Sequence, residues 1–216
     1  MLDVWFAREV QPRLRGRSFL IRYADDFVMG FACEADARRV LDVLPKRFGK
    51  YGLTLHPDKT RLVPFQRPPH QTSPTDSARD RRHGSFDLLG FTHFWARSRR
   101  GFWVVKRKTA SSRLSRALKA MAQWCRLNRH QPIAEQHHTL VQKLRGHVGY
   151  YGITGNSSAL KRFRDAVLRL WKKWLARRRR RGFLSWAVFG RLLERYPLPA
   201  ALAVHSVCRR VSEPVT

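Results

Sequence analysis

Two adjacent carboxylates, Asp25 and Asp26, stand in the middle of an apolar segment that runs from Ser18 to Phe31. Large apolar residues alternate before the pair with the period of a β-strand, which predicts a β-hairpin with the pair at or beside its turn. Carboxylates suit Mg²⁺, and two such ions can activate a 3′-hydroxyl and stabilise a leaving pyrophosphate in nucleotidyl transfer. The alternative is an Asx turn, in which the two aspartates only cap the hairpin.

The charge balance points to a polyanionic partner. The 216 residues include 44 Lys and Arg against 15 Asp and Glu, a formal net charge of +29. The excess is concentrated in residues 97–216, which hold 28 basic and four acidic residues, whereas residues 1–96 hold 16 and 11. So large a self-repulsion disfavours an ordinary small-molecule enzyme, and aromatic residues among the cations favour nucleic acid. An anionic membrane surface is the main alternative.

The remaining composition restricts the cellular setting. No apolar stretch approaches the roughly 20 residues that a membrane span requires, and the first residues contain no apolar signal core. The three cysteines, Cys33, Cys125 and Cys208, lie far apart. We therefore expect neither a disulfide framework nor a structural zinc site, and predict a cytoplasmic, reducing location for a protein with no membrane partner.

The first part of the chain, residues 1–105, has the pattern of an α+β domain. The hairpin over 18–31 is preceded by a short helix within residues 3–14 that ends before Pro12. It is followed by a helix over 34–51, which Pro45 should kink or divide. Short strands are predicted over 53–55 and 61–65 around the turn His56–Lys59, and a second hairpin from strands over 86–95 and 102–105. Proline-rich residues 66–84 are predicted to be a flexible insertion.

The second part, residues 106–216, is predicted to be a small helical bundle with cationic outer faces. Strand signals end at Ala110. Apolar residues recur at helical spacing from Leu114 to Cys125, and a second helix is predicted after Pro132 as far as Leu144. The strongest stripe lies between Leu160 and Trp174, and a shorter helix is expected over 186–196. The run Arg177–Arg181 is expected to continue the third helix.

Several segments together resemble one protein family. FLIRYADDFVMGF (Phe19–Phe31) resembles the YADD-box hairpin in the palm of reverse transcriptases. GLTLHPDKTRLV (Gly52–Val63) and FDLLGFTHFW (Phe86–Trp95) resemble the next palm motif and the primer grip of bacterial group II intron reverse transcriptase/maturases. RKT (Arg107–Thr109), LRGHVGYYGITGNS (Leu144–Ser157) and LKRFRDAVLRLWKKWL (Leu160–Leu175) are similar to the thumb and maturase region of that family.

The resemblance implies a partial reverse-transcriptase palm, made of β-hairpins and a helix, followed by an all-helical thumb and maturase bundle. It implies a family of RNA-directed DNA polymerases that use Mg²⁺, an RNA template and a DNA primer. It also implies binding of group II intron RNA and assistance in splicing and mobility.

Site residues follow from the same resemblance. It implies that Asp25 and Asp26 are catalytic metal ligands and that Lys59 assists near the triphosphate, although a solvated turn lysine is the alternative. Contacts to nucleotide or primer are expected from Tyr23, Ala24, Leu89, Gly90 and Phe91. RNA contacts are expected from Lys106, Arg107, Lys108, Arg145, Tyr150, Tyr151, Arg177, Arg178, Arg179, Arg180 and Arg181. Trp186 offers a further planar face, whereas the helical spacing of Trp171 and Trp174 favours core packing over base stacking.

One departure from the family pattern limits the expected activity. The polymerase site of this family needs a further carboxylate from an earlier palm strand, and only Asp3 and Glu9 precede the hairpin, both in helical context. The chain therefore resembles the C-terminal part of such an enzyme, and we expect no polymerase activity from it alone. A lone Cys208 also argues against the paired-cysteine endonuclease module of some relatives.

Three alternatives remain open at this stage. The chain could be the complementing half of a split polymerase, whose partner would carry the missing N-terminal half. It could instead be a stand-alone RNA-binding splicing cofactor, while a general DNA-compacting protein is the least supported. In each case, apolar surface where the missing palm strands would pair is expected to be exposed and prone to aggregation.

Overall fold

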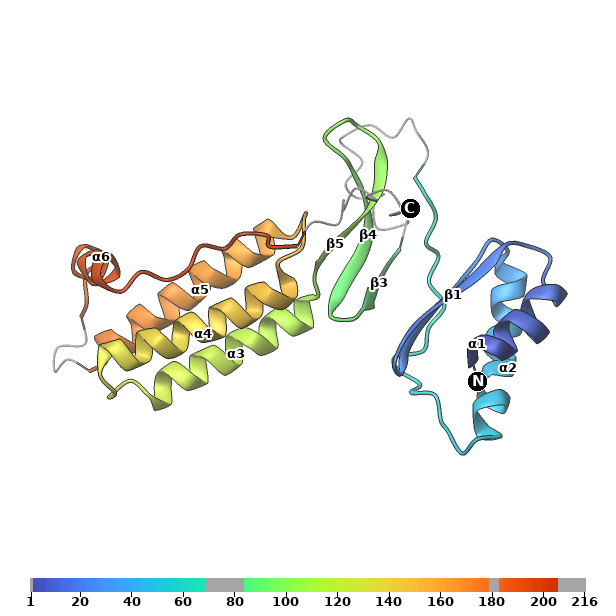
Figure 1. Ribbon diagram of the computed structural model, residues 1–216, viewed down its shortest axis with the longest axis horizontal. Coiled ribbons are helices and arrows are strands. Elements are labelled where there is room, and N and C mark those ends of the chain that lie inside the picture. Colours follow the sequence, from blue (N-terminus) through green and yellow to red (C-terminus); the bar gives the residue numbers. More distant parts are fainter. Residues whose placement is uncertain (1, 69–83, 179–182, 206–216) are drawn as a thin grey trace, which may run out of the picture. The chain divides into compact units, whose positions relative to one another are not determined.

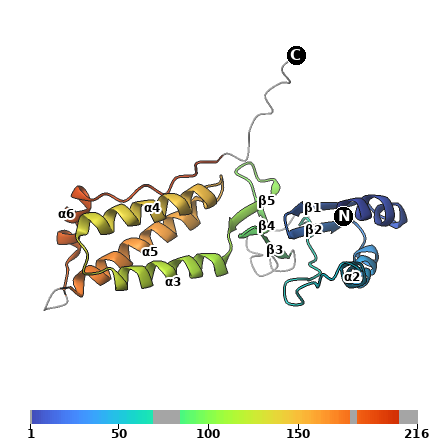
Figure 2. The same cartoon turned by 60° about the horizontal axis from the view of Figure 1, so that its bottom comes forward.

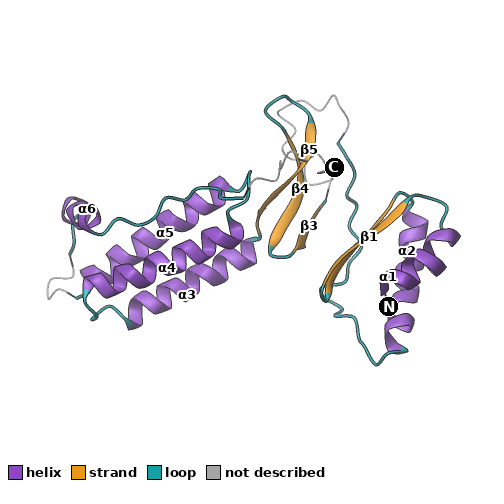
Figure 3. Cartoon of the chain, viewed as in Figure 1, coloured by secondary structure: helices purple, strands orange, loops and turns teal. Residues whose placement is uncertain are grey.

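The computed structural model describes residues 2–68, 84–178 and 183–205 (Figure 1). The chain forms two compact units: Met1–Leu89 with His93–Val105, and Gly90–Thr92 with Lys106–Thr216. Helices are accompanied by two small antiparallel sheets (Figure 3), which confirms the α+β class. Residues 69–83, which make up most of the predicted insertion, lie outside the described residues.

The first unit begins with a continuous helical segment. It consists of α1 (Leu2–Trp5), a π-helical turn η1 (Phe6–Val10) and a 3₁₀ turn η2 (Gln11–Arg13). Pro12 lies within the last turn and does not end the segment before it, because a proline at the start of a 3₁₀ turn forfeits no hydrogen bond. Buried Trp5, Phe6 and Val10 anchor this segment in the core of the unit.

Helix α2 (Glu34–Gly49) runs through Pro45 as one helix, so the prediction that the proline divides it is wrong. Val40 and Leu44 precede the proline and Phe48 follows it, and all of them pack in the same apolar cluster. Packing on both sides of Pro45 therefore offsets the backbone hydrogen bond that proline removes. The buried Asp36 carboxylate accepts from the backbone N–H groups of Arg15 and Gly16 at 2.9 and 3.0 Å, which fixes the loop before the hairpin.

The predicted hairpin is present as β1 (Ser18–Tyr23) and β2 (Asp26–Phe31). The strands pair antiparallel from Ser18 opposite Phe31 to Tyr23 opposite Asp26. Alternate residues of β1 remain uncovered: Phe19, Ile21 and Tyr23 are 54, 55 and 68% exposed. A two-stranded sheet with one large apolar face in water matches the exposed surface expected from the sequence.

The segment after α2 differs from the prediction. Residues 53–55 and 61–65 form no strands, and Leu53 and Leu62 are 50 and 40% exposed. Neither segment meets a strand partner among the described residues, and an extended segment without a ladder is not a β-strand. The turn at His56–Lys59 is confirmed, because the N–H groups of Lys59 and Thr60 donate to the His56 carbonyl at 3.2 and 3.0 Å.

The second sheet contains β3 (Ser85–Leu88), β4 (Phe91–Arg97) and β5 (Trp103–Thr109), in the order β3-β4-β5. The prediction of one strand over 86–95 is therefore wrong. Leu89 and Gly90 have φ values of 50° and 78°, which turn the chain back and divide the segment into two strands. Glycine makes such a left-handed turn accessible, and leucine rarely adopts it without neighbouring support.

The second unit is a helical bundle of α3 (Ser111–Leu127), α4 (Ile133–Tyr151), α5 (Ser157–Ala176) and α6 (Trp186–Arg195) (Figure 2). Its core contains Leu140, Val167, Trp171 and Phe189, each with 0% exposure. Helix α4 extends beyond the predicted end at Leu144. None of the helices in the described parts of the chain is long and apolar enough to cross a membrane.

The predicted continuation of the third helix through the arginine run is wrong. Helix α5 ends at Ala176 and Arg177 is its C-cap, because the last buried residue of its apolar stripe is Leu175. Arg177 and Arg178 add no apolar side chain to this stripe, so core packing does not support a further helical turn at these two residues. Arg179, Arg180 and Arg181 lie outside the described residues.

A buried asparagine joins three elements of the helical unit. The Oδ1 atom of Asn156 accepts from the backbone N–H of Thr109 at 2.9 Å, and its Nδ2 atom donates to Thr109 Oγ1 at 2.8 Å and to the Tyr151 carbonyl at 2.9 Å. Asn156 is 1% exposed. It therefore holds together the end of β5, the end of α4 and the start of α5.

We expect Asn156→Ala to lower the free energy of unfolding of the helical unit by about 2–3 kcal/mol, because it leaves buried polar groups of Thr109 without partners. Urea denaturation followed by circular dichroism measures the loss. Asn128→Ala is the matched control, since Asn128 makes one side-chain bond, to the Trp124 carbonyl at the end of α3. Equal losses in the two variants would contradict a joining role for Asn156.

His147 generates a prediction about pH. Its ring stacks on Phe163 with centroids 3.7 Å apart, its Nε2 atom is buried without a partner, and burial lowers its pKa from 6.5 to about 4. Between pH 6.5 and about 4, His147 is protonated in the unfolded chain but neutral in the folded state. Stability therefore falls as pH decreases from 6.5 towards 4, by at most about 1.4 kcal/mol per pH unit. Denaturant titrations at several pH values should show a smaller slope in His147→Phe; an unchanged slope would count against this origin.

Candidate nucleic-acid interface and acidic hairpin

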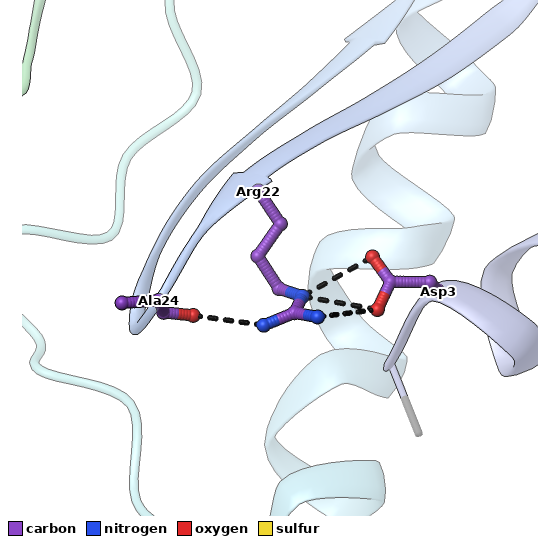
Figure 4. Close-up of polar contacts among 3 residues, drawn as sticks. All are labelled: Asp3, Arg22 and Ala24. Atoms are coloured by element: carbon purple, nitrogen blue, oxygen red, sulfur yellow. Dashed lines mark hydrogen bonds and ion pairs between the residues drawn. The ribbon is translucent and has the colours of Figure 1, made fainter.

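The turn that carries the acidic pair is held by Arg22. Its Nη1 atom donates to the Ala24 carbonyl at 3.0 Å, and its Nε atom lies 3.1 and 3.0 Å from the two carboxylate oxygens of Asp3 (Figure 4). The Nη2 atom completes the ion pair at 2.8 Å. Hydrogen bonding from Arg22 lowers the pKa of Asp3. Ala24 has a positive φ of 54°, so the turn is left-handed at a residue other than glycine, and Arg22 holds its carbonyl in place.

Asp25, Asp26 and Lys59 line one broad, open groove of the first unit, of about 2050 Å³. The groove also has apolar walls from the exposed face of β1 and from the segment after α2. It is larger than the roughly 300–1000 Å³ of typical small-molecule pockets, and it is an open trough. Such a surface suits an extended macromolecule better than a small metabolite.

The carboxylates of the hairpin do not make a complete metal site. In residues 2–68, 84–178 and 183–205, no three side chains of the types His, Cys, Asp or Glu come together. The two acidic residues ahead of the hairpin are engaged elsewhere: Asp3 with Arg22, and Glu9 with Arg47 at 4.0 Å. A two-ion site for nucleotidyl transfer needs more oxygen ligands than Asp25 and Asp26 provide. The donor set of the described residues therefore does not fit that chemistry by itself.

The predicted primer-grip residues Gly90 and Phe91 contact two predicted RNA-binding tyrosines in the helical unit. The Phe91 ring stacks on Tyr150 with centroids 5.9 Å apart and meets Tyr151 edge-on at 5.3 Å. A Cβ atom on Gly90 would lie 3.0 Å from the Tyr151 hydroxyl, so a larger residue would push this ring away. The Gly90 carbonyl accepts from the N–H of Ala110 at 2.9 Å, which ties the turn to the start of α3.

The environment of these tyrosines includes two guanidinium groups that the motif analysis did not single out. Burial, followed by the neighbouring Tyr150, raises the pKa of the Tyr151 hydroxyl, while Arg113 and Arg116 oppose this effect. Both arginines lie on the exposed face of α3. Tyr150 is 55% exposed and meets Tyr151 edge-on with ring centroids 4.8 Å apart, so one aromatic side chain of the cluster is accessible.

Helices α3 and α5 carry most of the exposed cations of the bundle. α3 has no acidic residue at all, and α5 has only Asp165, which pairs with Arg164 at 3.7 Å. Exposed cations on these two helices are Arg113, Arg116, Lys119, Arg126, Lys161, Arg162, Arg169 and Lys173. Their recurrence at intervals of three, four and seven residues was a usable signal in the sequence, because this spacing places side chains on one face of a helix.

A shallow groove of about 380 Å³ is lined by residues of both α3 and α5, which pack against each other. Leu118 and Ala122 of α3, and Ala166 and Leu170 of α5, form its apolar part. Lys119 and Arg169 also line the groove, one from each helix. The arrangement places two cations on opposite sides of a narrow apolar surface, which suits a phosphate backbone that lies along the helices.

The described part of the arginine run is used within the protein. The guanidinium of Arg178 donates to the backbone carbonyls of Gln131 and His130, at 3.1 and 3.4 Å, and thereby ties the loop between α3 and α4 to the end of α5. Arg177 lies 4.8 Å above the Trp174 ring. Of the other predicted RNA-binding cations, Lys108 and Arg145 are exposed, whereas Lys106 and Arg107 are partly buried.

The tryptophans of the helical unit differ in their exposure: Trp171 and Trp174 pack in the core, whereas Trp186 is exposed. Trp171 is fully buried and its indole N–H donates to Gln136 Oε1 at 3.0 Å, which confirms core packing. Trp174 is partly buried and packs against the same core. Trp186 is exposed, and it remains available to a ligand.

A scan of protein-family models, a search of curated proteins and a search of solved structures found no match to this chain.

Proposed function

We propose that this chain is a nucleic-acid-binding protein of the group II intron reverse transcriptase/maturase type, in which the helical unit binds intron RNA. In this proposal the binding assists splicing or mobility of the intron. The order of its sequence motifs supports the family, and the charged faces of α3 and α5 support the ligand.

The observation that carries the proposal is the charge of the helical bundle. Between residues 106 and 205, the described residues include 20 Lys and Arg but only three Asp and Glu, so intramolecular pairs can neutralise few of the cations. Lys119 of α3 and Arg169 of α5 border an apolar groove. Tyr150 offers an accessible ring and contacts Tyr151, whose hydroxyl is influenced by Arg113 and Arg116. Cations supply affinity for phosphates, and aromatic rings supply contacts to unstacked bases of folded RNA.

In this proposal the acidic hairpin supplies only part of a polymerase site. Asp25 and Asp26 are the pair that a palm would present, and Lys59 lines the same groove. Their donor set is too small for two metal ions, so we propose that template-directed polymerisation requires a further carboxylate from another polypeptide segment. Mg²⁺ is then the expected cofactor of the completed site only.

A stand-alone RNA-binding cofactor and half of a split polymerase are variants of this proposal. The first needs only the cationic bundle, whereas the second also needs the acidic pair. The exposed apolar face of β1 favours the second, because Phe19, Ile21 and Tyr23 would be covered by a neighbouring strand layer.

Charge reversal at the groove tests RNA binding. We expect the double variant Lys119→Glu and Arg169→Glu to weaken binding of a structured RNA at least tenfold at about 150 mM salt. The slope of log affinity against log salt should become shallower by about 1.4–1.8, since each of the two lost phosphate contacts removes roughly 0.7–0.9. Filter binding or fluorescence anisotropy over a salt series measures both quantities.

The matched control reverses the charge of two exposed lysines at the end of α2 in the other unit, by Lys46→Glu and Lys50→Glu. This control changes the net charge by the same amount, so it separates a located interface from a general effect of charge. An equal loss of affinity in both double variants would contradict RNA binding at the groove between α3 and α5.

Primer extension tests the acidic pair. With Mg²⁺, deoxynucleotides and a primed RNA template, we expect no extension by the purified chain, because its carboxylate set is incomplete. Asp25→Ala should bind RNA as tightly as the unchanged chain. Extension that disappears in Asp25→Ala would refute the incomplete-site argument, and loss of RNA binding in that variant would refute the separate roles of the two units.

A further inference from the structure

Trp186 is unusual among the tryptophans of this protein. All seven lie in the described residues, and Trp186 is the one whose side chain is classed as exposed, at 59%. Phe183, three residues earlier, is 71% exposed, whereas Leu184 between them is 6% exposed. Large aromatic side chains contribute strongly to cores, so leaving two of them in water on one short segment sacrifices apolar burial.

The exposed indole stands on an anchored turn. The Ser185 hydroxyl accepts from the N–H of Val188 at 3.3 Å and caps the start of α6. One turn further on, Phe189 is fully buried and meets both Trp186 and the core residue Trp171 edge-on, at 5.9 and 5.8 Å. The cap and the anchor fix the backbone on both sides of Trp186, so its side chain is presented from a rigid element.

A cation accompanies the indole. The Nζ atom of Lys172 on α5 lies 4.6 Å from the centroid of the Trp186 ring. Exposed Arg169 and Lys173 belong to the same helix, and its Asp165 is already paired with Arg164. Glu194 is the acidic residue of α6, which also carries Arg191 and Arg195. The surroundings of Trp186 are therefore net positive, with an accessible planar ring at their centre.

We propose that Trp186, together with Phe183, is a stacking platform for unpaired bases of single-stranded nucleic acid. Lys172 holds a phosphate next to the stacked base. This inference rests on the proposed function and specifies which form of nucleic acid the end of the bundle takes. Unpaired bases expose the faces that an indole can stack on, whereas a duplex keeps them covered by neighbouring base pairs.

A membrane surface is a poorer fit to this site. Insertion into a bilayer interface uses a continuous apolar face along a helix. Along α6, the residues that follow Trp186 turn inward at Phe189 or are charged at Arg191, Glu194 and Arg195. Two rings beside a cation suit base stacking, in which each ring needs one base and one neighbouring phosphate.

The experiment compares an unstructured 12-nucleotide RNA with a blunt RNA duplex, each titrated against the full chain at one salt concentration. We expect Trp186→Ala to weaken binding of the single strand about 5- to 100-fold, as is usual for loss of a stacking ring, and to change duplex binding less than twofold. Trp186→Phe should retain most of the single-strand affinity. Lys172→Ala should show a smaller loss that diminishes at high salt.

Phe102→Ala is the matched control, because Phe102 is also an exposed aromatic residue, at 55%, and lies in the other unit. Circular dichroism verifies the fold of each variant. If Trp186→Ala unfolds, Lys172→Ala keeps the test decisive, because the platform predicts a salt-sensitive loss of single-strand binding in that variant. Equal effects on single strand and duplex, or no effect on either, would overturn the platform while leaving RNA binding intact. If the unchanged chain binds neither RNA, the proposed function itself fails. Loss of binding to phosphatidylglycerol vesicles without loss of RNA binding would reassign the site to a membrane.

Discussion

The helical unit depends on the apolar stripe of α5. Leu160, Phe163, Val167, Trp171 and Leu175 recur at intervals of three and four residues and are all buried. Their burial fixes the rotation of the helix, and this rotation turns the cations of α5 outward, because a helix cannot bury one face without presenting the other. The hydrophobic effect thus decides where the charge lies, although it acts on none of the charged groups.

Such a dense cationic surface opposes folding, because like charges on one small bundle repel one another. Two features support the bundle against this repulsion. Trp171 combines full burial with a hydrogen bond to Gln136, so the centre of the core is fixed in position as well as apolar. Asn156 satisfies polar groups of Thr109 and Tyr151 where three elements meet. A polyanion that neutralises the outer faces would remove the repulsion, and binding would then stabilise the fold.

The first unit has a small core and leaves one apolar face of its hairpin exposed. Its core consists of Trp5, Phe6 and Val10 against α2, with one face of the hairpin, while the other face of β1 remains in water. Arg22 fixes the turn through Asp3 and the Ala24 carbonyl, so the acidic pair is positioned even though the sheet has only two strands. In the proposed relationship to reverse transcriptases, this unit keeps the acidic hairpin, and no further strand pairs with the hairpin among the described residues.

The sequence by itself determined the elements whose signal is local. The hairpin at Asp25–Asp26, the turn at His56–Lys59 and the apolar stripe of α5 follow from alternation, turn residues and helical spacing, which act over a few residues. Only the tertiary structure decided the outcomes that depend on distant partners. Packing in the first core carries α2 through Pro45, and the absence of a ladder leaves residues 61–65 without strand structure. Leu89 adopts a left-handed turn that local preference opposes. The accessibility of Trp186 was likewise set by packing, because whether neighbouring elements cover a tryptophan at the start of a helix depends on residues far away in the sequence.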